Sequence, residues 1–163
     1  TTPHQRPERK PLDLQVGRIV SVTKHPDAKK LFIEKVEIEK GEVIQIISGL
    51  VGHYTPEELS GKHVVVVRNL KPAKLRGEWS TGMLLAAEDD KGTVALIQAP
   101  NASPGTSVAV PGVTQRDAVQ ITIDEFFSHS LILEHGTVLI DNKEASVTGG
   151  LRVDKAMKNG KVS

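Results

Sequence analysis

Residues 62 to 83 read KHVVVVRNLKPAKLRGEWSTGM, and the rest of the chain is organised around them. The apolar run from Val64 to Val67 is typical of a buried strand. Four cations follow within nine positions, with no acid before Glu78: Arg68, Lys71, Lys74 and Arg76. Pro72 and Gly77 interrupt regular structure, so we predict a basic loop that leads to a strand beginning near Met83. Such a loop would present positive charge to an anionic partner, although a solvated lysine-rich turn gives the same pattern.

The other strands of the first 110 residues follow at hairpin spacing. Alternating apolar residues at even positions predict a strand from Leu12 to Val22, and Lys40-Gly41 predicts a hairpin turn. Thr55-Pro56-Glu57-Glu58 supplies the hydroxyl, proline and glutamate of a capped helix start. Further strands are expected over residues 32–38, 43–48, 62–67, 83–87, 94–98 and 107–110. One helix between the third and fourth strands predicts a mainly β chain with a five-stranded OB-fold barrel, and a β-sandwich fits the strand count almost as well.

Two further segments flank this barrel, which we place at residues 12–108. Residues 1–11 hold three prolines and three cations and are expected to form a Pro-rich basic linker. Residues 109–163 are expected to form a small α+β companion domain, with a polar boundary at 111–120. There Thr122-Ile123-Asp124-Glu125 is a second capping box before a short helix, and strands are expected at 131–134, 138–140 and 145–147. At about 50 residues this tail is too small to stand alone and should pack on the barrel.

The composition limits the classes of function. The chain has 21 Lys and Arg against 20 Asp and Glu, so any attraction to nucleic acid must come from local clusters of charge. It has no cysteine, which excludes disulfides and thiolate metal sites and fits a cytoplasmic, reducing location. No apolar run reaches the roughly 18 residues of a membrane span, and the start of the chain lacks the apolar segment of a secretory signal. We therefore expect no membrane partner.

Patterns that carry catalysis or bind metals are missing. The six histidines lack the spacing of a zinc site, and there is neither a nucleophile elbow nor a phosphate-cradling glycine loop. The adjacent acids Glu57-Glu58 and Asp89-Asp90 have structural explanations, the first at a helix start and the second in a turn. We therefore expect a non-catalytic protein with no cofactor and no metal.

RNA binding is better supported than catalysis. Sequence-tolerant binders of single strands need several stacking aromatics, and here Phe32, Phe126 and Phe127 have core-like positions. Trp79 and Tyr54 are left for stacking. So few aromatics beside a cationic loop favour recognition of the phosphate backbone and shape of a structured RNA. The basic surface would be larger if the connection that carries Lys24, Lys29 and Lys30 lay beside residues 68–76.

Five blocks of the sequence resemble, in order and spacing, the tRNA-binding domain typified by endothelial monocyte-activating polypeptide. They are Leu14-x-Val16-Gly17-x-Ile19, His25-Pro26-Asp27-Ala28-x-x-Leu31, Ser48-Gly49-Leu50-Val51, Asn69-Leu70-Lys71-Pro72-Ala73-Lys74-x-Arg76-Gly77 and Ser80-x-Gly82-Met83. That domain also occurs at the C-termini of tyrosyl- and methionyl-tRNA synthetases and in the yeast cofactor that delivers tRNA to synthetases. The resemblance covers residues 12–110 well and the tail weakly.

The resemblance implies an OB-fold that binds tRNA by its folded shape, near the elbow. It points to these contact or contact-supporting residues: Asn69, Lys71, Lys74, Arg76, Ser80 and Met83. The charge pattern adds Arg68, Lys29 and Lys30. The tail would mimic the second subunit of dimeric bacterial relatives, which implies a monomer. Two departures matter: Lys29 stands where relatives usually carry an acid, and the lysine-rich run that eukaryotic relatives place before the tail helix is missing from residues 114–120.

These inferences predict a non-catalytic module that binds tRNA for an aminoacyl-tRNA synthetase, in cis or in trans. Lys71, Lys74 and Arg76 would hold phosphates, Ser80 would hydrogen-bond the RNA backbone, and Met83 would shape the surface beneath. One alternative is a cytokine-like extracellular fragment, because residues 15–21 resemble a segment linked to cytokine activity in the family. Their alternation, however, predicts a partly buried strand. A second alternative is a protein-interaction adaptor with incidental RNA affinity.

Overall fold

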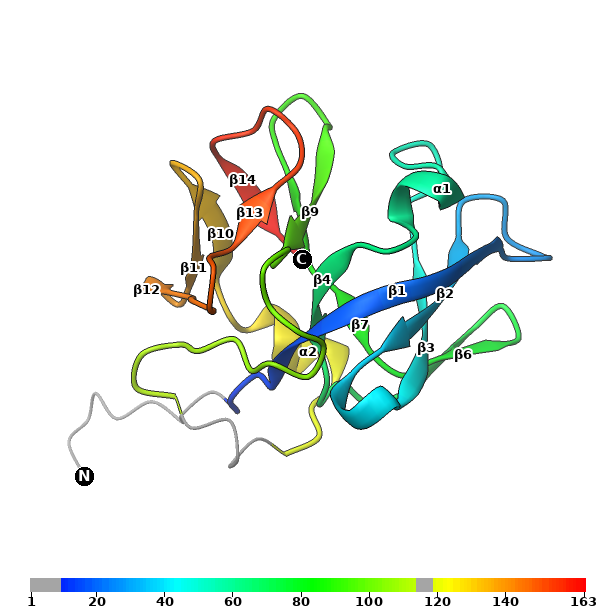
Figure 1. The fold of residues 1–163 in the computed structure, drawn as a ribbon, viewed down its shortest axis with the longest axis horizontal. Coiled ribbons are helices and arrows are strands. Elements are labelled where there is room, and N and C mark those ends of the chain that lie inside the picture. The colour runs from blue at the N-terminus through cyan, green and yellow to red at the C-terminus, as the bar shows by residue number, and fades with distance from the viewer. Residues whose placement is uncertain (1–9, 114–118) are drawn as a thin grey trace.

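The computed structural model describes residues 10–113 and 119–163, which form a mainly β structure with short helices (Figure 1). Most of the predicted linker at 1–11, and most of the polar segment at 114–120 that lacks a lysine-rich run, lie outside the described residues. Among the described helices none is long and apolar enough to cross a membrane.

The first three strands form the predicted meander. Strand β1 (Leu14–Lys24) pairs antiparallel with β2 (Phe32–Glu37), and β2 pairs antiparallel with β3 (Val43–Ser48). The turn between β2 and β3 contains the 3₁₀ turn η1 (Glu39–Gly41), in which Lys40 and Gly41 have φ of 55° and 76°. Two successive left-handed residues suit a tight hairpin, so the Lys40-Gly41 prediction is confirmed.

Both predicted capping boxes are confirmed. Helix α1 (Pro56–Leu59) begins after Thr55, whose hydroxyl accepts the Glu58 N–H, while the Glu58 carboxylate accepts the Thr55 N–H. Helix α2 (Ile123–Phe127) begins in the same way after Thr122, with Glu125 as the reciprocal partner. In each case the cap satisfies backbone donors that have no acceptor within the helix.

The basic stretch is not the loop that we predicted. After β4 (His63–Val67) the chain forms β5 (Ala73–Leu75) and β6 (Glu78–Ser80), which pair with each other as a separate two-stranded hairpin. Arg76 and Gly77 form its two-residue turn, with φ of 52° and 92°. This is the left-handed pair that a type I′ turn requires, so Gly77 makes the hairpin possible instead of interrupting it.

The remaining strands are short. They are β7 (Met83–Leu84), β8 (Ala86–Glu88), β9 (Val94–Gln98), β10 (Leu131–Glu134), β11 (Thr137–Ile140), β12 (Lys143–Glu144), β13 (Arg152–Val153) and β14 (Gly160–Val162). The strands predicted at 107–110 and 145–147 were wrong. Both segments are extended but make only isolated bridges, from Gln15 to Ser107 and from Ala109 to Ser146.

One antiparallel sheet joins the two halves of the chain. Its strand order is β12-β11-β10-β14-β8-β9-β4-β1-β2-β3, with β13 beside β9 and β7 beside β4. The hydrogen-bonded path is open, with β12 and β3 at its ends. In Figure 1 the tail strands gather on the left, while β1, β2, β3 and the β5–β6 hairpin extend to the right. The tail thus packs on the first part of the chain, as its small size led us to expect.

The central strands are buried on both faces. In β4, Val64 and Val66 belong to one apolar cluster, which includes Phe32, Leu59 and Leu96, whereas Val65 and Val67 belong to the other. The second cluster is completed by the tail, through residues such as Phe126, Leu131, Leu133, Val138 and Ile140. This arrangement explains the unbroken apolar run of β4, because alternation is expected only where one face meets water.

Strand β1 shows where the even-position pattern ends. Leu14 and Val16 are buried, but beyond Gly17 it is Ile19 that is buried, while Val20 is exposed. A bulge shifts the register between Ile19 and Ser21. At Gly17 a Cβ atom would lie 2.6 Å from Val36 Cγ1, so only glycine lets the strands approach this closely.

Candidate nucleic-acid interface

Two hydrogen bonds hold the basic hairpin against the connection between β1 and β2. His25 is buried, and its Nδ1 accepts the Asp27 N–H at 3.0 Å. Its other ring nitrogen, Nε2, then carries the proton and donates to Leu75 O on β5 at 2.9 Å. The Arg76 guanidinium donates to Asp27 O, also at 2.9 Å. The connection therefore lies beside the hairpin, which was the condition for Lys29 and Lys30 to extend the basic surface.

A second set of contacts fixes the other strand of the hairpin. The amide of Gln45 on β3 donates to Trp79 O at 2.8 Å, and Thr81 donates to Gln45 O through both its N–H and its hydroxyl. Lys35 donates to the Gln45 side-chain oxygen. Hydrogen bonds to Gln45 of β3 thus hold the backbone at the end of the hairpin.

Four of the nine predicted contact residues come together at the hairpin and its neighbouring connection. Lys29, Lys30 and Arg76, with Asp27, Ala28 and Leu31, line a shallow hollow of about 460 Å³. Lys74 lies on β5, with its Nζ 6.0 Å from the centre of the Trp79 ring. These four cations and Lys71, which lies two residues before β5, are exposed, and we refer to the five together as the basic surface: Lys29, Lys30, Lys71, Lys74 and Arg76.

Three other predicted residues are occupied within the protein. Arg68 donates to Gln15 at 3.0 Å and lies 3.9 Å from a Glu42 oxygen. Ser80 is buried, and its hydroxyl accepts the Ile47 N–H and donates to Gly82 O, both at 3.0 Å. Met83 is half-buried and packs against the apolar cluster that the tail completes. Each of these three side chains thus has contacts within the chain, and their contact with RNA stays a prediction.

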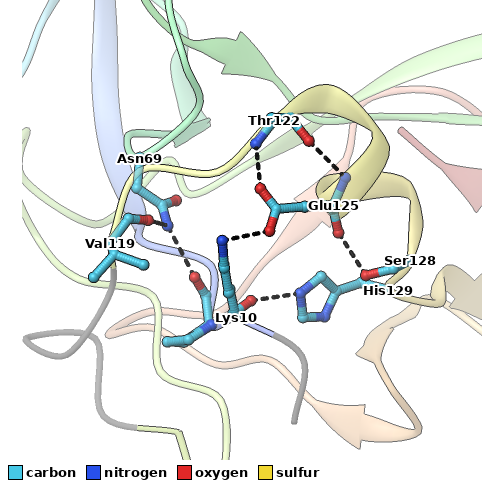
Figure 2. A network of polar contacts seen from close by, with 8 residues as sticks. Lys10, Asn69, Val119, Thr122, Glu125, Ser128 and His129 are labelled. Carbon is cyan, nitrogen blue, oxygen red and sulfur yellow. Dashed lines mark hydrogen bonds and ion pairs between the residues drawn. The ribbon is translucent and has the colours of Figure 1, made fainter. Parts of the chain in front are cut away.

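Asn69 joins three segments at the start of the basic stretch (Figure 2). Its Oδ1 accepts the Asp13 N–H at 2.9 Å, and its Nδ2 donates to Pro11 O and Val119 O at 2.9 and 2.7 Å. The amide group is therefore fully engaged in contacts within the chain. Asn69 sets where the stretch leaves β4, rather than offering an amide to a ligand.

Lys10 is held in the same network. Its Nζ forms an ion pair with Glu125 at 2.6 Å, and its carbonyl lies 2.8 Å from His129 Nε2 (Figure 2). The hydrogen bond from Lys10 lowers the pKa of the half-buried Glu125 carboxyl, and the Thr122 N–H acts in the same direction. The first described residues are thus attached both to the Asn69 segment and to helix α2.

A buried carboxyl lies in the strand behind the hairpin. Glu34 points into the core between Phe32 and Val36 and is fully buried. Ser48 donates to its Oε2, while Oε1 has no partner among the described residues. Burial raises the pKa of Glu34 to about 7, and the Ser48 hydrogen bond offsets only part of this effect.

Two of the stacking assignments need correction. Trp79 is 53% exposed on the hairpin, whereas Tyr54 is only 5% exposed, with its ring in the core. Phe127, which we expected in the core, is 59% exposed on α2. Successive side chains of a helix point in different directions, so this helix buries Phe126 while Phe127 faces solvent.

Sequence reasoning missed the roles of His25 and Gln45. Each contacts the hairpin across a large separation along the chain, from His25 to Leu75 and from Gln45 to Trp79. No local pattern predicts such partners. The only available signal was the place of His25 in the His25-Pro26-Asp27 block.

A family model described as "Putative tRNA binding domain" matches residues 14–107, which are more than half of the chain. The matched range contains β1 to β9 and the entire basic surface. The chain therefore belongs to this family of tRNA-binding domains.

Relatives in sequence show which kind of protein carries a similar domain. Methionine–tRNA ligase of Treponema denticola is 40% identical over 94% of this chain and 21% of its own length. The enzyme of the same name from Pyrococcus horikoshii is 51% identical over 53% of the chain and 12% of its own length. The domain is thus related to methionyl-tRNA synthetases, and it spans about a fifth of the length of the first of them.

Solved structures agree with the fold. The C-terminal domain of Plasmodium vivax p43 superposes with a TM-score of 0.84 over 96% of this chain and 99% of that one, at 24% identity. This likeness extends over the tail. A MetRS-related protein from Pyrococcus horikoshii has a TM-score of 0.56 and 37% identity, and covers 60% of this chain and 90% of its own.

Proposed function

We propose that this chain is a non-catalytic module that binds the folded shape of tRNA through the basic surface and serves an aminoacyl-tRNA synthetase, in cis or in trans. One observation carries the proposal. Two hydrogen bonds, from His25 to Leu75 O and from Arg76 to Asp27 O, bring the cations of two distant segments onto one surface. Membership of the tRNA-binding family supports tRNA as the partner.

The charge of the surface supports binding to phosphates. Residues 24–31 and 68–80 together contain seven cations and two acids, Asp27 and Glu78, in a chain whose net charge is +1. Each phosphate that a lysine or arginine neutralises releases counterions, so affinity should fall with salt by about 0.7 to 0.9 log units per contact and per decade of salt. Lys71, Lys74 and Arg76 together would contribute a slope of about 2 to 3.

The test replaces Lys71, Lys74 and Arg76 by glutamine and titrates folded tRNA at several salt concentrations. We expect a large loss of affinity and a slope flatter by about 2 to 3. A matched control replaces three exposed lysines elsewhere, Lys91, Lys143 and Lys158, which removes the same charge. Equal affinities and slopes for the two triple variants would refute a localised tRNA site.

The preference for folded RNA needs its own comparison. The unmodified chain is titrated with folded tRNA, unfolded tRNA and a DNA duplex. We expect folded tRNA to bind best, because five cations fixed on a small rigid surface match phosphates held at fixed spacing. Equal affinity for all three nucleic acids would refute a preference for folded tRNA and would indicate a general attraction to polyanions.

The finer parts of the proposal have their own support. An OB-type barrel is supported by α1, which lies between β3 and β4 and places Leu59 in the cluster enclosed by β1 to β4. A monomer with a tail domain at 109–163 is supported by the tail side chains that cover the second face of β4, and gel filtration tests it. We also propose a cytoplasmic location, which suits a tRNA partner.

A further inference from the structure

Trp79 is a half-exposed aromatic held on a rigid base. It is the single tryptophan of the chain and lies on β6 directly opposite Lys74 of β5. Its carbonyl is held by the Gln45 amide, and the next residue, Ser80, is buried and hydrogen-bonded on both sides. The backbone that carries the indole is therefore held in place, while 53% of the residue's surface is exposed.

One cation, Lys74, lies close to this ring. Lys74 Nζ lies 6.0 Å from its centre, because directly opposite residues of a hairpin project from the same face. Lys35 on β2 donates to the side-chain oxygen of Gln45, and the amide of the same Gln45 donates to the Trp79 carbonyl. The nearest acid in sequence, Glu78, projects from the opposite face of the two-stranded hairpin, since side chains alternate along a strand.

We propose that Trp79 stacks on an unpaired base of the bound RNA while Lys74 contacts a phosphate of the same or the adjacent nucleotide. The inference rests on the proposed function and adds a base contact to a surface that otherwise binds phosphates. A base inside an A-form helix has both faces covered, so the contact requires a base splayed out at a loop, bulge or end. It would distinguish a folded RNA from a plain duplex without reading the sequence, because every base has a π face.

The chain offers a matched control. Phe127 is exposed to a similar extent, 59%, but it lies on α2, in the same short helix as Asp124 and Glu125. The exposed Asp124 carboxylate would repel a phosphate backbone, whereas Glu125 is paired with Lys10. Phe127 lies outside the basic surface, so Phe127→Leu controls for the loss of an exposed aromatic elsewhere on the chain.

The first experiment measures tRNA affinity over a salt series for Trp79→Leu, Trp79→Phe and Phe127→Leu. Stacking on an aromatic is worth about 1 to 3 kcal/mol per base, so Trp79→Leu should weaken binding by about five- to 150-fold. Its salt slope should stay unchanged, because no cation is lost. Trp79→Phe should retain most of the affinity, and Phe127→Leu should bind like the unmodified chain.

The second experiment reads the contact directly. Trp79 is the single tryptophan, so its fluorescence reports on its own surroundings and should be quenched when tRNA saturates the chain. An RNA duplex with one unpaired nucleotide should bind more tightly than the fully paired duplex, and Trp79→Leu should abolish this preference. A merely structural tryptophan would give neither result.

The outcomes separate the two proposals. Unchanged tRNA affinity in Trp79→Leu, or unquenched fluorescence at saturation, would overturn the stacking contact, and a protein partner for the ring would then be sought. If the triple variant of Lys71, Lys74 and Arg76 still lost affinity, the tRNA-binding function would stand without it. If that triple variant bound like the unmodified chain, the proposed site itself would fail.

Discussion

Replacement of Glu34 by glutamine should remove most of the pH dependence of stability near neutrality. Glu34 is fully buried, and burial raises its pKa from 4.5 to about 7. In the unfolded chain the same carboxyl would titrate near its ordinary value. Glutamine resembles the protonated carboxyl in shape and can still accept the hydrogen bond from Ser48.

The direction of the pKa shift of Glu34 determines how the free energy of unfolding changes with pH. A carboxyl whose pKa is raised in the folded state binds a proton more tightly there, so its contribution to stability is complete below pH 4.5. That contribution is lost as the pH rises through 7. A difference of 2.5 pH units at 1.36 kcal/mol each corresponds to a loss of about 3 kcal/mol. At pH 8, Glu34→Gln should therefore be more stable than the unmodified chain by up to about 3 kcal/mol.

The assay is urea unfolding followed by circular dichroism at intervals from pH 4 to 8. The two proteins should have similar free energies of unfolding at pH 4 and diverge steadily as the pH rises. Glu88→Gln, at an exposed glutamate of β8, is the control and should leave the profile unchanged. Parallel profiles for Glu34→Gln and the unmodified chain would refute the reasoning, since they would mean that Glu34 ionises as easily in the core as in water.

Three further predictions concern stability and are each measured by urea unfolding. Tyr54→Phe should cost about 1 to 3 kcal/mol, because it leaves the buried Leu96 N–H without its acceptor. Asn69→Ala should cost about 2 kcal/mol, since three hydrogen bonds of its amide are lost, and Asn69→Asp should recover only the one from Asp13. Thr122→Ala should cost about 1 kcal/mol through loss of the cap. An unchanged unfolding midpoint in any of the three would contradict the corresponding contact.

Features that depend on neighbouring residues could be predicted from the sequence. Both capping boxes and the Lys40-Gly41 turn involve residues at most three positions apart, and all three are found as expected. The strand at Val64 to Val67 was equally clear, because an apolar run needs only burial to explain it. Exposure of Phe127 could not be predicted, since it depends on where a short helix ends.

The hairpin within the basic stretch was missed for a physical reason. Its strands have three residues each, and β5 is exposed throughout, so no apolar alternation marks them. Gly77 was interpreted as an interruption, although Arg76-Gly77 is the turn. The hairpin is held by His25 from the β1–β2 connection and by Gln45 from β3, both far away along the chain, so no local pattern marks these contacts.

The sequence predicted which residues belong to the candidate site better than it predicted how they are arranged. Charge alone identified the five exposed cations, but it could not separate them from Arg68, which is paired with Gln15 and Glu42. The motif blocks identified Asn69 and Ser80, yet the structure engages both side chains within the chain. A motif can thus mark residues that position a site as readily as residues that touch a ligand.

The tail helps to position the basic surface, whose five residues all precede it in the sequence. Asn69 ties the end of β4 to Val119, and the Lys71 N–H donates to Ile121 O at 2.7 Å, so the tail fixes where the stretch begins. The β1–β2 connection and Gln45 fix where the hairpin ends. Because β4 is buried on both faces, a loosened tail would expose one face of this strand and release the start of the stretch together. The position of the cations therefore depends both on the packing of the tail and on the contacts that the hairpin makes with the β1–β2 connection and with β3.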